Sequence, residues 1–217
     1  MANLFSRKTN WLPLKLFIVV NVIGMIATAG VFYYFTPKYT RVGYEPIQPV
    51  AFQHDIHAKQ LGIDCRYCHS YVEVSAHSNI PTTQVCMGCH SQVQKGNPKL
   101  KPVYDSWTTG KPIEWVQIHK TPDYVYFNHA VHVNRGVSCY SCHGQVNDMK
   151  VVFHDQSLSM AWCLECHRNP ENFLRPRDQV FNLDWHPPTG TSQRELGLKL
   201  KQAWKVNPPE DCAGCHR

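Results

Sequence analysis

The chain has 217 residues, of which 43% are hydrophobic and 18% are charged, and it contains ten Cys and thirteen His. This length fits one domain or a small domain with an appendage, and the composition excludes a disordered chain. The net charge of +6 does not indicate nucleic-acid binding, because the Lys and Arg are scattered and no run of five basic residues occurs. Cysteine and histidine are therefore expected to carry the chemistry.

The first expected element is a membrane-spanning helix over residues 16–35. These twenty residues are uncharged, and at about 1.5 Å per residue they extend about 30 Å, the thickness of a bilayer core. Arg7, Lys8 and Lys15 precede the run, and no acidic residue accompanies them. The positive-inside rule therefore places the N-terminus in the cytoplasm.

A cleavable signal peptide is the alternative, because Ala27 and Ala29 form the small-x-small pattern of a processing site. Ala29 lies inside the apolar run, however, and this run is long for a signal-peptide core. We therefore favour a retained single-pass anchor in the inner (cytoplasmic) membrane. Residues 1–40 then form the cytoplasmic segment and the anchor, and residues 41–217 form a domain on the periplasmic, outer face.

All ten cysteines fall into five C-x-x-C-H motifs, which attach c-type haem: the two thiols add to the porphyrin vinyl groups and the adjoining His becomes the proximal iron ligand. Zinc ribbons and disulfides also use C-x-x-C, but neither requires a His after every pair, and ribbons take the pairs two at a time. The sequence thus predicts five covalently bound haem c groups with their iron. The motifs are Cys65, Cys68 and His69; Cys86, Cys89 and His90; Cys139, Cys142 and His143; Cys163, Cys166 and His167; and Cys212, Cys215 and His216.

An internal repeat covers residues 52–90 and 127–167. Each half begins with F-x-H-x-x-H and continues with two haem motifs, and the fifth motif follows at 212–216. Beyond the anchor each haem has only about 35 residues around it, too few for a conventional two-layer core. We therefore expect a mainly irregular head with short α-helices and almost no sheet, whose core is formed by the haems.

A low-spin electron-transfer haem needs a second axial ligand, His or Met. The strongest candidates are the two F-x-H-x-x-H pairs, because His residues three apart on one helical turn can reach the irons of adjacent haems. These candidates are His54, His57, His129 and His132.

His119 is a further candidate ligand. Met149 or Met160 could instead complete one His/Met site, which would raise the potential of that haem. Simple packing against porphyrin is the alternative for either methionine. Three more histidines have open roles, as ligands or as exposed or structural side chains: His77, His154 and His186.

Two parts of the chain resemble known cytochromes. Residues 52–57, 65–69 and 80–90 resemble the multihaem class III cytochromes c. Residues 113–129 and 159–168 are similar to the pentahaem subunit of alternative complex III, a quinol:electron-acceptor oxidoreductase of respiration. The likeness runs from about residue 50 to the C-terminus and includes the number of haem motifs and the anchor.

The resemblance implies an electron wire without a substrate site of its own, and it implies His119 as a ligand. Its partners would be an iron–sulfur subunit, integral quinol-binding subunits, and a monohaem cytochrome c or an oxidase. One alternative is a self-contained membrane-anchored quinol dehydrogenase that feeds a periplasmic reductase. A catalytic multihaem reductase is disfavoured, because it needs an iron with an open distal side and here the distal candidates outnumber the irons.

Overall fold

The structure, a computed structural model, describes residues 7–35 and 41–216. The chain divides into two compact units, with the division between Arg41 and Val42. The predicted domain boundary at residue 40, like the first residues of the predicted cytoplasmic segment, lies outside the described residues.

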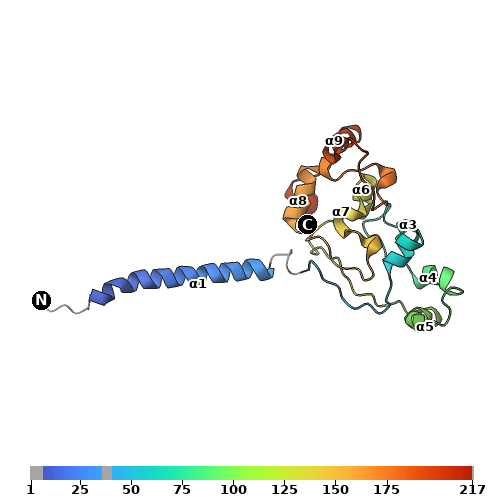
Figure 1. The fold of residues 1–217 in the computed structure, drawn as a ribbon, viewed down its shortest axis with the longest axis horizontal. Coiled ribbons are helices and arrows are strands. Elements are labelled where there is room, and N and C mark those ends of the chain that lie inside the picture. The colour runs from blue at the N-terminus through green and yellow to red at the C-terminus, as the bar shows by residue number, and fades with distance from the viewer. Residues whose placement is uncertain (1–6, 36–40, 217) are drawn as a thin grey trace. The chain divides into compact units, whose positions relative to one another are not determined.

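The first unit is one long helix (Figure 1). A 3-10 turn, η1 (Arg7–Trp11), leads into α1 (Leu12–Phe35), whose 24 residues extend about 36 Å. Among the described residues this is the one helix long and apolar enough to cross a membrane. It contains the whole of the span predicted at residues 16–35.

The polar side chains of α1 bond within the helix. Asn21 Nδ2 donates to the carbonyl oxygen of Phe17 at 2.8 Å, and Thr28 Oγ1 donates to that of Gly24 at 2.8 Å. Each bond joins a residue to the one four positions earlier, which is the usual way for such side chains to be satisfied in an apolar helix. Neither side chain therefore requires a partner helix.

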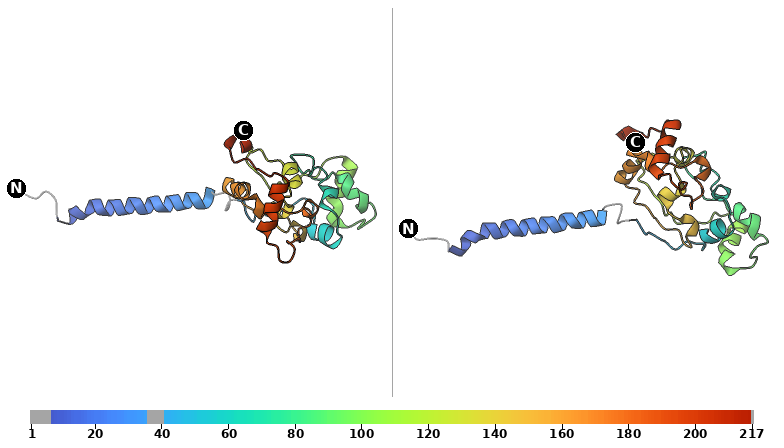
Figure 2. Two further views of the ribbon diagram at one scale, coloured as in Figure 1. Left: turned by 90° about the horizontal axis from the view of Figure 1, so that it is seen from above. Right: turned by 45° about the horizontal axis from the view of Figure 1, so that its top comes forward.

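The second unit, here called the head, consists of short helices joined by irregular chain (Figures 1 and 2). In its described part it contains no strand, only two isolated antiparallel bridges, Val125 with His216 and Val137 with Leu174. The predicted fold class is confirmed. The elements of the head are the π-helix η2 (Asp55–Gln60), α3 (Cys65–Cys68), α4 (Thr83–His90), η3 (Pro98–Leu100), α5 (Lys101–Thr109), α6 (His129–Asn134), α7 (Cys139–His143), η4 (Val146–Asp148), α8 (Met160–Arg168), η5 (Pro170–Asn172), η6 (Arg177–Gln179), α9 (Gln193–Ala203) and α10 (Cys212–Cys215).

The head has a small protein core. Among the described residues, eight apolar side chains are buried, although a chain of this length ordinarily buries most of its apolar surface. The eight are Val50, Val72, Val103, Val133, Met149, Leu174, Val180 and Leu183. The described part of the head therefore has only a small apolar core of its own.

Helix α9 packs closely against η5. A Cβ atom at Gly197 would lie 1.8 Å from the carbonyl oxygen of Glu171, so only glycine permits this approach. Lys201 Nζ binds the buried Glu171 carboxylate at 2.9 Å, and Gln193 Nε2 donates to the carbonyl oxygen of Leu174 at 2.6 Å. The helix therefore fixes the segment from η5 to Leu174.

That segment in turn supports the third haem motif. Beside the bridge between Leu174 and Val137, the backbone N–H of Arg175 donates to the carbonyl oxygen of Gly136 at 2.9 Å. The fully buried Ser138 donates its hydroxyl to the carbonyl oxygen of Val180 at 2.8 Å. Residues 174–180 therefore fix the position of residues 136–138, which directly precede the third haem motif.

Candidate haem centres

The five C-x-x-C-H motifs, numbered 1 to 5 in chain order, lie on the short helices α3, α4, α7, α8 and α10. At four of them a polar side chain accepts a backbone N–H and so caps the start of the helix. One helical turn then places the two cysteines, three positions apart, on the same side, which suits two bonds to one porphyrin edge. The capping residues are Asp64, Ser138, Ser159 and Asp211.

The ten thiols lie on five separate helices. None is in a disulfide, and burial raises the pKa of Cys139 and Cys142 to about 12 and that of Cys166 to about 11. Within residues 7–35 and 41–216, no three His, Cys, Asp or Glu side chains converge on one metal position. A zinc ribbon would bring four such ligands together.

Three of the five proximal histidines donate their Nδ1–H to a backbone carbonyl oxygen. His69 binds that of Asn79 at 2.8 Å, His90 that of Val93 at 3.1 Å, and His167 that of Pro209 at 2.7 Å. A carbonyl acceptor fixes the proton on Nδ1, which leaves the Nε2 lone pair for a metal and fixes the plane of the ring. The hydrogen bonds of these three histidines are therefore those typical of histidines that bind a metal through Nε2.

Three of the four histidines in the F-x-H-x-x-H pairs have the same bond between Nδ1 and a backbone carbonyl oxygen. His57 Nδ1 lies 2.8 Å from the carbonyl oxygen of Gln53, His129 Nδ1 lies 2.8 Å from that of Ala76, and His132 Nδ1 lies 2.8 Å from that of Asn128. In His54, by contrast, Nδ1 is buried without a hydrogen-bond partner among the described atoms.

The repeat is also visible in how the phenylalanine of each pair packs. Phe52 stacks on His57 with ring centroids 4.4 Å apart, and Phe127 stacks on His132 at 4.7 Å. The same phenylalanines meet the first histidine of each pair edge-on, Phe52 with His54 at 4.9 Å and Phe127 with His129 at 4.7 Å. The two F-x-H-x-x-H segments are therefore alike in three dimensions, although one forms a π-helix and the other an α-helix.

Three distal candidates face proximal histidines across a common distance. The ring centroids are 6.1 Å apart for His57 and His90, 6.5 Å for His129 and His143, and 6.2 Å for His132 and His167. An iron between two imidazoles, with metal–nitrogen bonds of about 2.0 Å and about 1.1 Å from nitrogen to ring centroid, separates the centroids by about 6.2 Å. The residues therefore fit haem iron bound by two histidines.

His54 lies near the proximal His69. Burial lowers the pKa of His54 to about 4, and the neighbouring His69 and His57 contribute to the lowering. Burial also lowers the pKa of His129 and His132. The imidazoles of His54, His129 and His132 are therefore neutral at physiological pH, the form that binds iron.

His119 lies beside a proximal histidine rather than across from it. Its Nε2 is 3.3 Å from His143 Nδ1, and the two ring centroids are 4.3 Å apart, too close for an iron between them. Burial, followed by the proximity of His119, lowers the pKa of His143 to about 3. If His119 binds iron, as the sequence leads us to expect, it must bind an iron other than that of His143.

The other candidates differ in burial. Met149 is buried, and its carbonyl oxygen accepts from the backbone N–H of His54 at 3.1 Å. Met160 is 62% exposed at the start of α8. His77 and His186 are exposed, whereas His154 is fully buried with its ring 5.2 Å from that of His119. Sequence reasoning had left the burial of His154 open.

The fifth motif packs against the segment that precedes the second F-x-H-x-x-H. The backbone N–H of Tyr126 donates to the carbonyl oxygen of Cys215 at 2.7 Å, and the Tyr124 ring lies 5.6 Å from that of His216. Tyr124 was not predicted to be near a haem. The sequence around Tyr124 carries no signal for this contact, because Tyr124 and His216 are 92 positions apart.

Repeated thiol pairs on single helical turns, each with an adjoining imidazole, and second imidazoles at iron-bridging distance define a multihaem c-type cytochrome. Comparison with known proteins agrees with this class. The family described as cytochrome c7 and related cytochrome c matches residues 125–217. The chain belongs to these cytochrome c7-type multihaem cytochromes c, so it binds haem c covalently and transfers electrons.

Two relatives are similar over longer stretches. The multiheme cytochrome c subunit of menaquinone reductase from Nitratidesulfovibrio vulgaris (strain Hildenborough) is 30% identical over 148 residues, which cover 58% of this chain and 70% of that subunit. Cytochrome c-552 from Maridesulfovibrio salexigens is 26% identical over 235 aligned positions, which cover 83% of this chain and 46% of that protein.

Proposed function

We propose that the chain binds five haem c groups and is the electron-wire subunit of a membrane-bound quinol-oxidising complex of respiration. The observation that carries the haem assignment is the set of histidine pairs 6.1–6.5 Å apart. Bound haem would supply one-electron chemistry at its iron, and the chain would hold each iron between two fixed side chains that tune its potential.

The axial pairs follow the repeat. In each half, the first His of F-x-H-x-x-H would serve the first haem and the second His the second haem. His54 is assigned by this analogy and by its proximity to His69. The proposed pairs are His54 with His69, His57 with His90, His129 with His143, and His132 with His167.

The fifth iron, bound by His216, would take its second ligand from the remaining candidates, which are His119, Met149 and Met160. Met160 is favoured, because it begins the helix that carries Cys163, and Cys163 lies near motif 5: burial, followed by the proximity of Cys215, raises the pKa of the Cys163 thiol. Met149 instead packs beside the first F-x-H-x-x-H.

A pair of matched variants tests this ligand. Met160→Leu should abolish a methionine-to-iron charge-transfer band, and Met149→Leu should retain it, with five haems per chain in both proteins. Loss of the band in Met149→Leu alone would show that Met149 is the ligand. Absence of the band in the wild type would show that neither methionine binds the iron.

The histidine pairs are tested by a cycle of variants. His132→Met should raise the potential of one haem in the five-haem protein. In a protein that lacks haem 4, made by Cys163→Ala and Cys166→Ala, the same substitution should leave all remaining potentials unchanged, because its iron is gone. A shift that persists without haem 4 would contradict the pairing.

The role in a complex is supported by the N-terminal helix, by the likeness to the pentahaem subunit of alternative complex III, and by a relative named as a menaquinone reductase subunit. Residues 16–35 would anchor the chain in the cytoplasmic membrane, with the N-terminus in the cytoplasm and the head on the outer face. The proposed partners are an iron–sulfur subunit, integral quinol-binding subunits, and a monohaem cytochrome c or an oxidase.

Purification through a tag on this chain tests the complex. The partners should co-purify from detergent-solubilised membranes, and added menaquinol should reduce the haems of the assembly but not those of the isolated subunit. Menaquinol oxidation by the isolated subunit would instead support the self-contained dehydrogenase.

Quinone reduction is a second candidate, favoured by the name of the relative. In that direction the head would receive electrons from a reduced one-electron carrier and pass them to the membrane. Quinol formation by the assembly with such a carrier, without measurable quinol oxidation, would decide for this direction.

A further inference from the structure

Motifs 1 and 2 meet through the first F-x-H-x-x-H. His54 lies beside His69 of motif 1, and His57 faces His90 of motif 2 with ring centroids 6.1 Å apart. The two motifs are also in contact, because a Cβ atom at Gly88 of motif 2 would lie 3.5 Å from the hydroxyl oxygen of Tyr67 in motif 1. Three positions along one helical turn thus separate the ligands of haem 1 and haem 2.

Motif 3 adjoins motif 1, not motif 2. The segment that follows motif 1 binds α6: the backbone N–H and the Nδ1–H of His129 both donate to the carbonyl oxygen of Ala76, at 3.1 Å and 2.8 Å. Asn134 Nδ2 donates to the carbonyl oxygen of Glu73 at 2.8 Å. Since His129 faces His143 of motif 3 at 6.5 Å, this contact brings haem 3 next to haem 1.

Motifs 3 and 4 meet through α6 as motifs 1 and 2 meet through η2. His129 faces motif 3, and His132, one turn later, faces His167 of motif 4 at 6.2 Å. Motif 5 adjoins motif 4: His167 Nδ1 donates to the carbonyl oxygen of Pro209 at 2.7 Å, and Arg168 Nε lies 3.4 Å from Glu210 Oε2.

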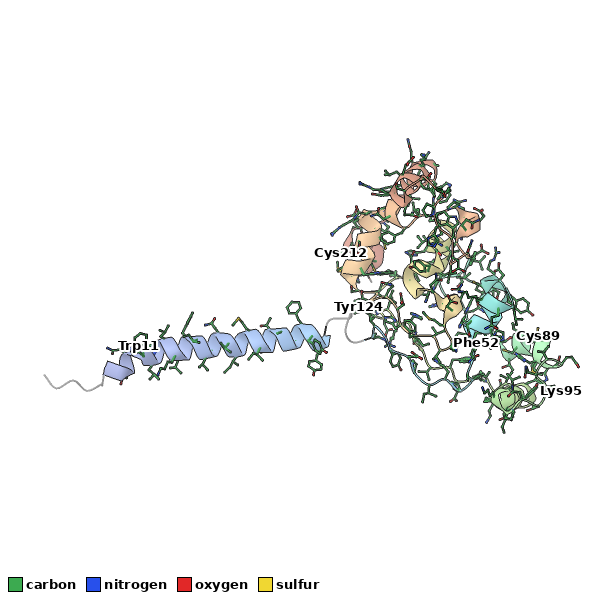
Figure 3. The ribbon with its side chains drawn as sticks, viewed as in Figure 1. Trp11, Phe52, Cys89, Lys95, Tyr124 and Cys212 are labelled. Carbon is green, nitrogen blue, oxygen red and sulfur yellow. The ribbon has the colours of Figure 1, made fainter. Side chains whose placement is uncertain are left out.

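The two ends of this row coincide with the two exposed haem cysteines. Cys89 of motif 2 and Cys212 of motif 5 are exposed, and the other eight are partly buried. Figure 3 shows these two residues on opposite sides of the head. The exposure of the cysteines and the sequence of contacts between neighbouring motifs therefore indicate the same two ends, independently of each other.

We infer that the five haems form one row in the order 2–1–3–4–5, and that electrons enter and leave through haems 2 and 5. This order rests on the proposed five-haem function and refines it. With haem bound, each step would move one electron from a ferrous iron to a neighbouring ferric iron, so that one iron would be oxidised as the next is reduced, and no bond would form or break.

The end at haem 2 is basic. Four exposed lysines follow motif 2 within 22 residues that include one acidic residue, Asp105, and Lys95 lies near Cys89 in Figure 3. This end therefore fits an electron-transfer protein with an acidic docking face, which the positive field would also steer. The four lysines are Lys95, Lys99, Lys101 and Lys111.

Removing one haem at a time tests the order. In the row 2–1–3–4–5, loss of haem 1 (Cys65→Ala, Cys68→Ala) isolates haem 2, so the ferric protein should show one magnetically uncoupled low-spin signal that integrates to one of its four haems. Loss of haem 2 (Cys86→Ala, Cys89→Ala) removes an end and should leave all four remaining haems coupled. A row in sequence order, 1–2–3–4–5, predicts the reverse for both variants and would overturn the inference, as would coupling of all four haems in both.

If either variant fails to retain four haems, the same order can be tested in proteins that keep all five. His54→Met and His57→Met should raise the potentials of haem 1 and haem 2 respectively, so that the first electron added makes that haem diamagnetic. The uncoupled signal should then appear in His54→Met and not in His57→Met, and the opposite result refutes the order. Haem content by mass separates these outcomes from failure of the five-haem proposal itself.

The basic end is tested with ferricyanide, an anion that takes one electron and becomes ferrocyanide. Replacing Lys95, Lys99 and Lys111 by Glu should slow oxidation of the fully reduced protein roughly threefold to tenfold at low salt and little at high salt. The control replaces Lys199 and Lys205, on and after α9, by Glu. An equal effect in the control, or no effect in the first variant, would refute this docking end.

Discussion

Gly197→Ala separates the effect of local helix propensity from that of packing, because the two predict opposite signs. In an α-helix, alanine stabilises by about 1 kcal/mol relative to glycine. At position 197, however, the new Cβ would lie 1.8 Å from the carbonyl oxygen of Glu171, whereas ordinary contact begins at 3.4 Å. Helix α9 would therefore have to move about 1.6 Å away from η5, the difference between these two distances.

Such a shift breaks the 2.9 Å contact between Lys201 and Glu171 and the 2.6 Å bond from Gln193 to Leu174. Forced overpacking typically costs 1–3 kcal/mol and can cost more, so we expect a net loss of about 2 kcal/mol or more. For a chain of this size the loss lowers Tm by about 4–8 °C.

The assay is thermal unfolding of the matured protein, with haem content measured in the same samples. Gln202→Ala, at an exposed position of the same helix, is the matched control and should leave Tm within about 1 °C. An unchanged or raised Tm in Gly197→Ala would refute the packing argument and leave helix propensity as the dominant effect.

Three further predictions concern the same unit and its anchor. Lys201 holds the pKa of Glu171 below its ordinary value of 4.5, so their pair stabilises the head above about pH 4.5 and its contribution is lost as pH falls through the folded pKa. Glu171→Gln should lower stability by about 1–3 kcal/mol at pH 7, and its denaturant midpoint should converge with that of the wild type once the pH falls below the lowered pKa of Glu171. Ser138→Ala leaves a buried carbonyl of Val180 without its donor and removes a helix cap, so it should cost about 1–3 kcal/mol in the same assay; an unchanged midpoint would contradict the role of this bond. Removal of residues 1–40 should release the haem-loaded head from the membrane fraction without loss of haem, whereas haem loss would show that the head needs its anchor.

The sequence predicts the attachment of haem c, because C-x-x-C-H is a local pattern. The spacing of His129 and His132 predicts that one helical turn serves two neighbouring irons, and their separations from His143 and His167 agree with this. The sequence also predicts the scarcity of sheet, since each haem has so few residues around it.

The arrangement of the motifs could not be predicted in this way. The contact that brings motif 3 to motif 1 joins His129 to Ala76, 53 positions apart, through a backbone carbonyl that has no sequence signature. The position of His119 beside His143 likewise depends on tertiary packing, and the sequence alone favoured it only as an iron ligand. Long-range contacts, rather than residue types, determine both.

The small protein core has a consequence for when the head can fold. With eight apolar side chains buried among the described residues, the chain gains too little from its own burial to offset the ordering of its backbone. Cofactor attachment and folding then become one process, as in small metal-dependent domains that are unfolded without their metal. A chain that has not yet received haem would stay extended and able to pass through a membrane, and each haem added would commit the segment around it to its final place.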